Sequence, residues 1–244
     1  MRTANPALSD STFETVGLGS AKPMTLQGTV NKTALLLFIL FVPAVYTWKQ
    51  TLENPASSTM WIGVGAIAGL ILCLVTCFKK EWSPVTAPLY AAAEGLFLGA
   101  LSARFNMLYD GIVLQAVMLT GGTLFALLAA YSMRLIKATE NFKLGIFAAT
   151  GGIALVYLAT IVLGFFNIQI PYIHGSGWIG IGFSAVVVVI AALNLVMDFD
   201  FIENGCTNGA PKYMEWYAGF GLLVTLVWLY VEILRLLSKL ADRR

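Results

Sequence analysis

Seven long apolar runs, separated by short polar segments, divide most of the chain. Each run approaches the roughly 20 residues that a helix needs to cross a bilayer. The runs are continuous rather than alternating, which favours helices over the strands of a barrel. The predicted spans are residues 33–48, 60–78, 84–103, 112–133, 144–166, 178 to about 201, and about 216 to 237. We therefore predict an all-α integral membrane protein, a bundle of seven transmembrane helices.

The segments outside these runs suggest a simple organisation. Residues 1–31 form a polar N-terminal segment without the pattern of a cleaved signal peptide. Residues 32–240 form the membrane domain, and residues 241–244 form a short charged tail. Only 11% of the residues are charged and 58% are hydrophobic, whereas a soluble domain has about a quarter charged residues. The net charge of +2 gives no indication of nucleic-acid binding.

Lysine and arginine positions predict a cytoplasmic N-terminus. Nine basic residues would then face the cytoplasm: Arg2, Lys22, Lys32, Lys79, Lys80, Arg134, Lys137, Lys143 and Lys212. Lys49 and Arg104 would face outward, and so would the basic tail that contains Lys239, Arg243 and Arg244. The basic tail conflicts with the rule that lysine and arginine are enriched on the cytoplasmic side. A last segment that only partly crosses the membrane would remove the conflict.

Small residues mark the predicted helix contacts. Gly65 and Gly69, and likewise Gly95 and Gly99, have the G-x-x-x-G spacing that lets membrane helices approach closely. Glycine pairs also occur at 121–122 and 151–152. We favour packing within one bundle over dimerisation, because a polytopic chain has many internal interfaces. Cys73 and Cys77, one helical turn apart, are interpreted as small core residues.

Acids within or at the ends of the spans are the candidate functional groups, since a buried charge needs a partner, a wet cavity or a proton. Glu94 lies near the centre of the third span. Asp198 shares a helix face with Asn194, which predicts that it points into the bundle. Asp200 and Glu203 share another face, directed to the headgroups or the cytoplasm.

The last span contains one more acid within its apolar run. Glu232 lies three residues before Arg235 and could pair with it, while Glu215 lies beside Lys212 and is interpreted as interfacial. Two carboxylates from different helices could share a proton or hold a hard cation such as calcium.

The sequence lacks the residues that a zinc hydrolase, a serine hydrolase or a nucleotide-binding enzyme would need. The single histidine, His174, falls in a loop, and no phosphate-binding G-x-x-x-x-G-K-[ST] motif occurs. We therefore expect no enzymatic activity and no cofactor, with calcium as the one candidate ligand.

Three segments resemble motifs of one known family. Residues 93–99, Ala-Glu-Gly-Leu-Phe-Leu-Gly, resemble its Glu-Gly-Leu-x-Leu-Gly signature. Residues 197–200, Met-Asp-Phe-Asp, are similar to its aromatic-Asp-Thr segment, and residues 229–236 to its Leu-Tyr-Leu-Asp-x-x-Asn-Leu stretch. The family is the Bax inhibitor-1, or transmembrane Bax-inhibitor-motif, family. Residues 5–8 and 212–216 look like a bacterial branch of it, which implies the plasma membrane of a prokaryote.

The resemblance implies a seven-helix bundle with a central last helix and a pH-sensitive calcium leak. In that reading Asp198 and Glu232 form the proton-sensing carboxylate pair and are the calcium candidates. Asp200, Glu94 and Arg235 belong to the surrounding polar network. The chain has Glu232 where the family has aspartate and Arg235 where it usually has asparagine. Glu215 is the rival partner of Asp198.

We therefore expect a proton-modulated cation (calcium) leak. The alternative hypothesis is an interaction protein that modulates a membrane-anchored protease or a stress response without transport. Residues 1–31 would then be the segment that binds the partner.

Overall fold

The computed structural model describes residues 23–166, 175 and 177–243; most of the N-terminal segment and the loop with His174 lie outside this part. Seven long helices form the described chain, and all are long and apolar enough to cross a membrane. The seven-helix prediction is confirmed. The helices are α2 (Leu26–Glu53), α3 (Ser57–Phe78), α4 (Ser83–Leu108), α5 (Ile112–Ser132), α6 (Glu140–Phe165), α7 (Trp178–Thr207) and α8 (Met214–Ala241), and a short 3-10 helix, η1 (Lys80–Trp82), precedes α4.

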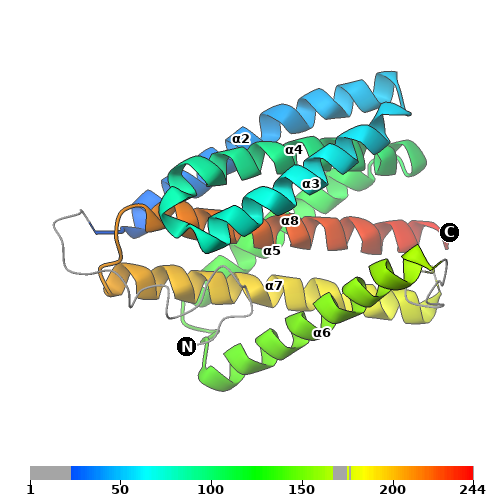
Figure 1. The fold of residues 1–244 in the computed structure, drawn as a ribbon. Coiled ribbons are helices and arrows are strands. Elements are labelled where there is room, and N and C mark those ends of the chain that lie inside the picture. The colour runs from blue at the N-terminus through cyan, green and yellow to red at the C-terminus, as the bar shows by residue number, and fades with distance from the viewer. Residues whose placement is uncertain (1–22, 167–174, 176, 244) are drawn as a thin grey trace.

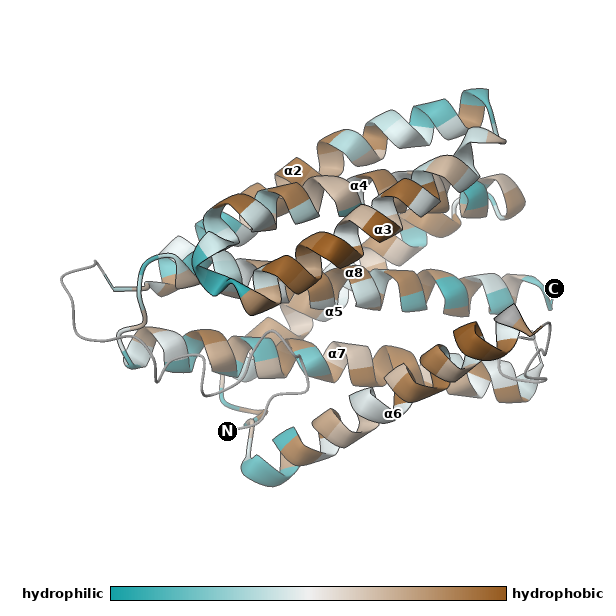
Figure 2. Cartoon of the chain, in the orientation of Figure 1, coloured by the Kyte–Doolittle hydropathy of each residue, from teal (hydrophilic) through white to brown (hydrophobic). Residues whose placement is uncertain are grey.

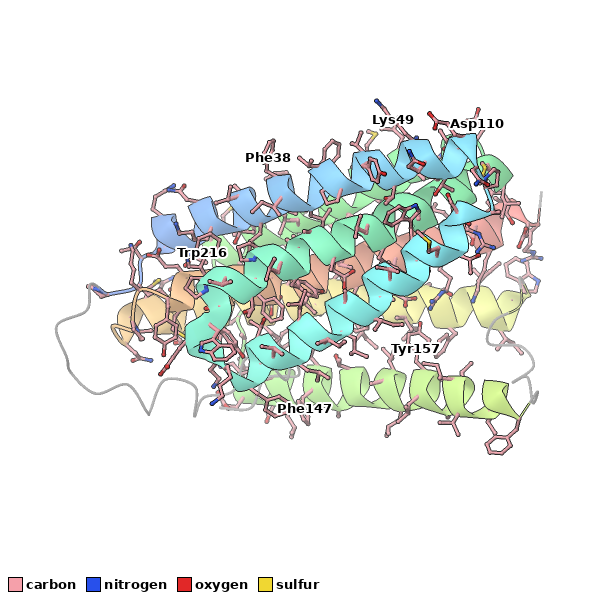
Figure 3. All side chains as sticks on the ribbon, turned by 45° about the horizontal axis from the view of Figure 1, so that its top comes forward. Phe38, Lys49, Asp110, Phe147, Tyr157 and Trp216 are labelled. Atoms are coloured by element: carbon pink, nitrogen blue, oxygen red, sulfur yellow. The ribbon has the colours of Figure 1, made fainter. Side chains whose placement is uncertain are left out.

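The helices run alternately from one end of the bundle to the other (Figure 1). We call the end at which α2 begins the proximal end and the end at which α8 finishes the distal end. Trp216 marks the proximal end, and Lys49 and Asp110 mark the distal end (Figure 3). Helix α8 is a continuous helix of 28 residues. The alternative of a last segment that only partly crosses is therefore wrong, and the basic tail lies at the distal end.

Helix α8 lies at the centre of the bundle, as the resemblance implied. Of its most apolar stretch, 67% is buried, whereas the outer helices α2, α3 and α5 each bury 17% of theirs. Helices α2, α4, α5 and α7 pack around it (Figure 1). Its fully buried side chains include Tyr217, Phe220 and Leu223. Four surrounding helices thus remove α8 from lipid.

The outer faces of the bundle carry apolar side chains. Phe38 on α2 is 67% exposed and points away from the bundle. Apolar residues predominate along the helices, and many polar residues lie near the helix ends (Figure 2). Exposed apolar residues over the length of several helices are the surface that lipid tails would cover.

Glycines allow α4 to pack directly against its neighbours. A Cβ atom on Gly95 would lie 2.2 Å from the carbonyl oxygen of Leu40, and one on Gly99 would lie 2.1 Å from that of Ala44. On α3, a Cβ on Gly65 would lie 2.6 Å from the backbone nitrogen of Phe97. Both G-x-x-x-G pairs therefore pack inside one bundle, as expected.

The other glycine pairs do not have this role. A Cβ atom on Gly121, Gly122, Gly151 or Gly152 would meet nothing within 4 Å in the described part of the chain. The expectation that they mark close helix contacts is wrong, because α5 and α6 turn these positions away from their neighbours.

Close packing at Gly99 yields a stability prediction. Gly99→Ala would push a methyl group into the α2 backbone, an overpacking cost of about 1–3 kcal/mol. We expect a lower thermal unfolding midpoint in detergent for this variant. Gly122→Ala is the matched control, since its methyl group meets open space and alanine favours a helix. Equal midpoints for Gly99→Ala and Gly122→Ala would contradict the packing described for α4.

Candidate functional site

Glu232, on the distal half of α8, is a buried carboxylate with a positive partner. Its exposed fraction is 1%. Arg235 Nη1 lies 3.0 Å from Oε1 and 3.2 Å from Oε2 of Glu232. The i,i+3 spacing on a helix places the two side chains together, so the pair predicted from the sequence is present. The guanidinium supplies the positive charge that a carboxylate at this depth requires.

Tyr157 of α6 completes this group, and the sequence analysis missed it. Its hydroxyl donates to Glu232 Oε1 at 2.8 Å and accepts from Arg235 Nη1 at 2.7 Å. The guanidinium also lies 5.2 Å from the centre of the Tyr157 ring. Figure 3 shows Tyr157 on α6. A tyrosine within an apolar run carries no charge signal, so its role became visible only from the position of α6.

Asp198, on α7, is also 1% exposed but lies at another level of the bundle. Lys239 of α8 donates to Ser184 of α7 at 2.9 Å, which aligns the two antiparallel helices. Asp198 is fourteen residues from Ser184, and Glu232 is seven residues from Lys239, both in the proximal direction. The seven-residue difference corresponds to an axial offset of about 10 Å.

The contacts of α6 give the same result. Asn194 donates to Thr150 at 2.9 Å, and Tyr157 binds Glu232. Asp198 lies four residues to the proximal side of Asn194, and Tyr157 lies seven residues to the distal side of Thr150. Counted through α6, Asp198 and Glu232 are therefore offset by about 16 Å along the bundle axis. Both routes place Asp198 nearer than Glu232 to the proximal end of the bundle, and the pairing of the two carboxylates stays a prediction.

Glu215, the rival partner of Asp198, is engaged elsewhere. Its Oε1 accepts from the backbone nitrogen of Thr25 at 3.0 Å, from the Thr25 hydroxyl at 2.8 Å and from Lys212 Nζ at 2.7 Å. The Thr25 hydroxyl in turn caps α2 by accepting from the nitrogen of Gly28. Glu215 thus fastens the start of α2 to the start of α8.

Asp200 and Glu203 lie near the proximal end of α7. Asp200 Oδ2 accepts from the buried Lys143 of α6 at 2.9 Å and from Asn204 at 2.9 Å. Glu203 is exposed, and its Oε2 accepts from the Tyr131 hydroxyl at 2.5 Å. Asp200 therefore forms an ion pair between α7 and α6 and is not simply a solvated residue at the end of α7.

These contacts form three polar rungs between α6 and the rest of the bundle. The α6 residues Lys143, Thr150 and Tyr157 are seven residues apart, which puts them on one face of the helix. They bind Asp200, Asn194 and Glu232, respectively. We call this set the α6 ladder.

Apolar packing contributes little to the attachment of α6. Only 11% of its most apolar stretch is buried, and a small cluster around Ile146 and Met197 joins it to α7. Helix α6 diverges from the remaining bundle over part of its length (Figure 1). The α6 ladder is therefore a large share of what holds this helix.

Glu94 is separate from the α6 ladder. It is half-buried on α4 and faces α3, where a Cβ atom on Gly69 would lie 2.7 Å from its Oε1. In the described part of the chain it makes no hydrogen bond to a ladder residue. The structure thus places Glu94 at the α3–α4 contact and not beside Glu232 or Asp198.

The basic C-terminal end is held by the start of α7. Lys239 Nζ donates to the carbonyl oxygen of Gly180 at 3.0 Å, and the guanidinium of Arg243 lies 3.7 Å from the Trp178 ring centre. These contacts accommodate two of the tail charges that conflicted with the orientation rule.

No cluster of three or more histidine, cysteine, aspartate or glutamate side chains that could hold a metal occurs among the described residues.

The buried ion pair leads to a test by a double-mutant cycle. Glu232→Gln and Arg235→Gln each leave one charge without its partner, whereas the double variant removes both charges. We expect each single variant to unfold at a lower temperature in detergent than the double variant. Additive effects of the two substitutions would show that the pair contributes no coupling.

Comparison with known proteins agrees with the architecture. The model of the family described as Bax inhibitor 1 like matches residues 5–242, nearly the whole chain. Searches of curated proteins and of solved structures found no match. The matched region contains all seven spans, the α6 ladder and the acids of α7 and α8. The chain therefore belongs to the Bax inhibitor 1-like family and is a multipass membrane protein.

Proposed function

We propose that this protein is a proton-modulated cation leak in which protonation of Glu232 releases α6. The observation that supports this proposal best is the position of the buried Glu232 carboxylate. It binds Arg235 on its own helix and Tyr157 on the loosely packed α6. A titratable group at a helix contact can act as a switch, because its charge decides whether the contact is stable.

The chemistry of the Glu232 contact sets the direction of gating. The ionised carboxylate attracts the Arg235 guanidinium and accepts the Tyr157 hydrogen bond. A proton on Glu232 removes the charge attraction and weakens its acceptor oxygen. The distal rung of the α6 ladder then fails, so lower pH favours separation of α6 from α8.

Separation of α6 would uncover polar groups on α7. Asn194 lies on the face that contacts α6, and Asp198 lies one helical turn further along the same face. A carboxylate is a suitable ligand for a hard cation such as calcium. Asp198 and Glu232 thus have separate roles: Glu232 senses the proton, and Asp198 attracts the cation.

Calcium flux into liposomes across a pH series tests the proposal. Wild type should conduct more as the pH falls. Glu232→Gln imitates the protonated carboxylate, so its flux should be high at neutral pH and nearly independent of pH. Asp198→Asn should reduce flux at every pH, because the attractive charge is lost. Glu53→Gln, at an exposed acid at the end of α2, is the control and should match wild type.

Equal flux in all four proteins at every pH would contradict this function. Absence of flux together with capture of a membrane-anchored protease would favour the alternative, an interaction protein. In that case deletion of residues 1–22 should abolish the capture. If the protein is a leak, the same deletion should leave the calcium flux of wild type and of the three variants in the same relative order.

Cross-linking tests whether α6 must move. The 2.9 Å bond between Asn194 and Thr150 makes these positions neighbours. In a background in which Cys73, Cys77 and Cys206 are replaced by alanine, Thr150→Cys with Asn194→Cys should form a disulfide on oxidation. We expect oxidation to suppress flux at low pH and reduction to restore it. Unchanged flux in fully cross-linked protein would show that α6 does not gate the path.

A further inference from the structure

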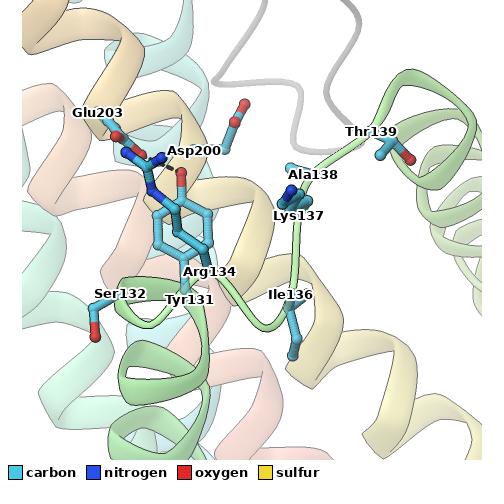
Figure 4. Close-up of a pocket in the computed structure, with 9 residues that line it drawn as sticks. All are labelled: Tyr131, Ser132, Arg134, Ile136, Lys137, Ala138, Thr139, Asp200 and Glu203. Atoms are coloured by element: carbon cyan, nitrogen blue, oxygen red, sulfur yellow. Dashed lines mark hydrogen bonds between the residues drawn. The ribbon is translucent and has the colours of Figure 1, made fainter.

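A pocket of about 460 Å³ opens at the proximal end, between the end of α5, the α5–α6 connection and α7. Figure 4 shows Tyr131 and Arg134 on the α5 side, Lys137 on the connection, and Asp200 and Glu203 on α7. The proposed leak uses none of the pocket's basic residues. The function of these basic residues is therefore separate from the proposed leak.

Charges of both signs line this pocket. Arg134 and Lys137 supply two positive groups, and Asp200 and Glu203 supply two negative groups. Both basic side chains are exposed and have no ion pair within the part of the chain that the structure describes. A lining with this balance favours a ligand that itself carries both charges over a simple anion or cation.

The acidic side retains acceptor atoms for a ligand. Asp200 uses Oδ2 for Lys143 and Asn204, and Glu203 uses Oε2 for the Tyr131 hydroxyl. Each of these carboxylates has a second oxygen, and Glu203 is exposed while Asp200 is half-buried. Carboxylate oxygens are the acceptors that a primary ammonium group, which has three donors, requires.

The backbone holds the basic side of the pocket in an unusual conformation. Arg134 has φ of +58°, in the left-handed region that non-glycine residues rarely adopt. The backbone nitrogens of Arg134 and Leu135 donate to Tyr131 and Ala130, at 2.9 Å each, and stabilise this turn. The turn returns the chain toward α7, which places the Arg134 guanidinium at the pocket.

The position of the pocket indicates a membrane lipid. It lies where α5 and α7 end and α6 begins, which is the headgroup level of the bilayer. Met133 and Leu135, on either side of Arg134, are 63% and 73% exposed, as expected next to acyl chains. Tyr131 is typical of the interfacial aromatic belt.

We propose that this pocket binds the phosphate-and-ammonium headgroup of a phospholipid such as phosphatidylethanolamine. Arg134 and Lys137 bind the phosphate, and Glu203 with Asp200 Oδ1 binds the ammonium. The headgroup then bridges α5, the α5–α6 connection and α7. The acyl chains lie outside, along Met133 and Leu135.

Native mass spectrometry from mixed micelles tests the site with three lipids of equal chain length. Wild type should retain phosphatidylethanolamine several-fold more than phosphatidylcholine, whose methylated ammonium donates no hydrogen bond. Retention of phosphatidylethanolamine by wild type should also exceed that of phosphatidylglycerol, which has no amine. Glu203→Gln should remove the preference for ethanolamine, since the exposed Glu203 can change without disturbing the fold. Arg134→Gln with Lys137→Gln should lower retention of all three lipids.

Lys79→Gln, at a basic residue on another loop, is the control and should retain the wild-type order. Equal retention of the three lipids by wild type, or an unchanged ethanolamine preference in Glu203→Gln, would overturn the site. Soluble glycerophosphoethanolamine distinguishes the source of the headgroup. Retention of this compound at the level of the intact lipid would overturn the assignment to a membrane lipid.

Discussion

A carboxylate inside a bilayer must have a partner, and this requirement organises the centre of the bundle. Glu232 lies on the most buried helix, so its charge needs a cation and further hydrogen bonds. Arg235 provides the cation from the next turn of α8, and Tyr157 provides a hydroxyl from α6. Because Tyr157 comes from another helix, the Glu232 carboxylate is part of the contact between α6 and α8.

Two kinds of contact hold the helices, and they differ in how easily they can be reversed. Lipid tails are as apolar as leucine, so burial of apolar side chains does little to join helices within a membrane. Helix α4 instead uses Gly95 and Gly99 to bring its backbone onto α2. Helix α6 uses the polar bonds of the α6 ladder. Close backbone packing does not respond to pH, whereas a bond to a carboxylate does.

Hydropathy predicted the number of spans and nearly all of their positions, because the length of an apolar run sets whether it crosses. The i,i+3 pairing of Glu232 with Arg235 also follows from spacing within one helix. The relative level of Asp198 and Glu232 does not follow, since it depends on how far α7 and α8 slide past each other. Lys143 was assigned to a cytoplasmic loop but is buried against Asp200, because α6 begins earlier than the apolar run indicates.

The central claim is that protonation of Glu232 separates α6 from the bundle. Spin labels at Leu158 on the exposed face of α6 and at Phe38 on the outer face of α2 report this separation as a distance. In lipid, the distance distribution should lengthen and broaden as the pH falls, and it should already do so at neutral pH in Glu232→Gln. A distribution that stays the same across the pH range in both proteins would contradict the account.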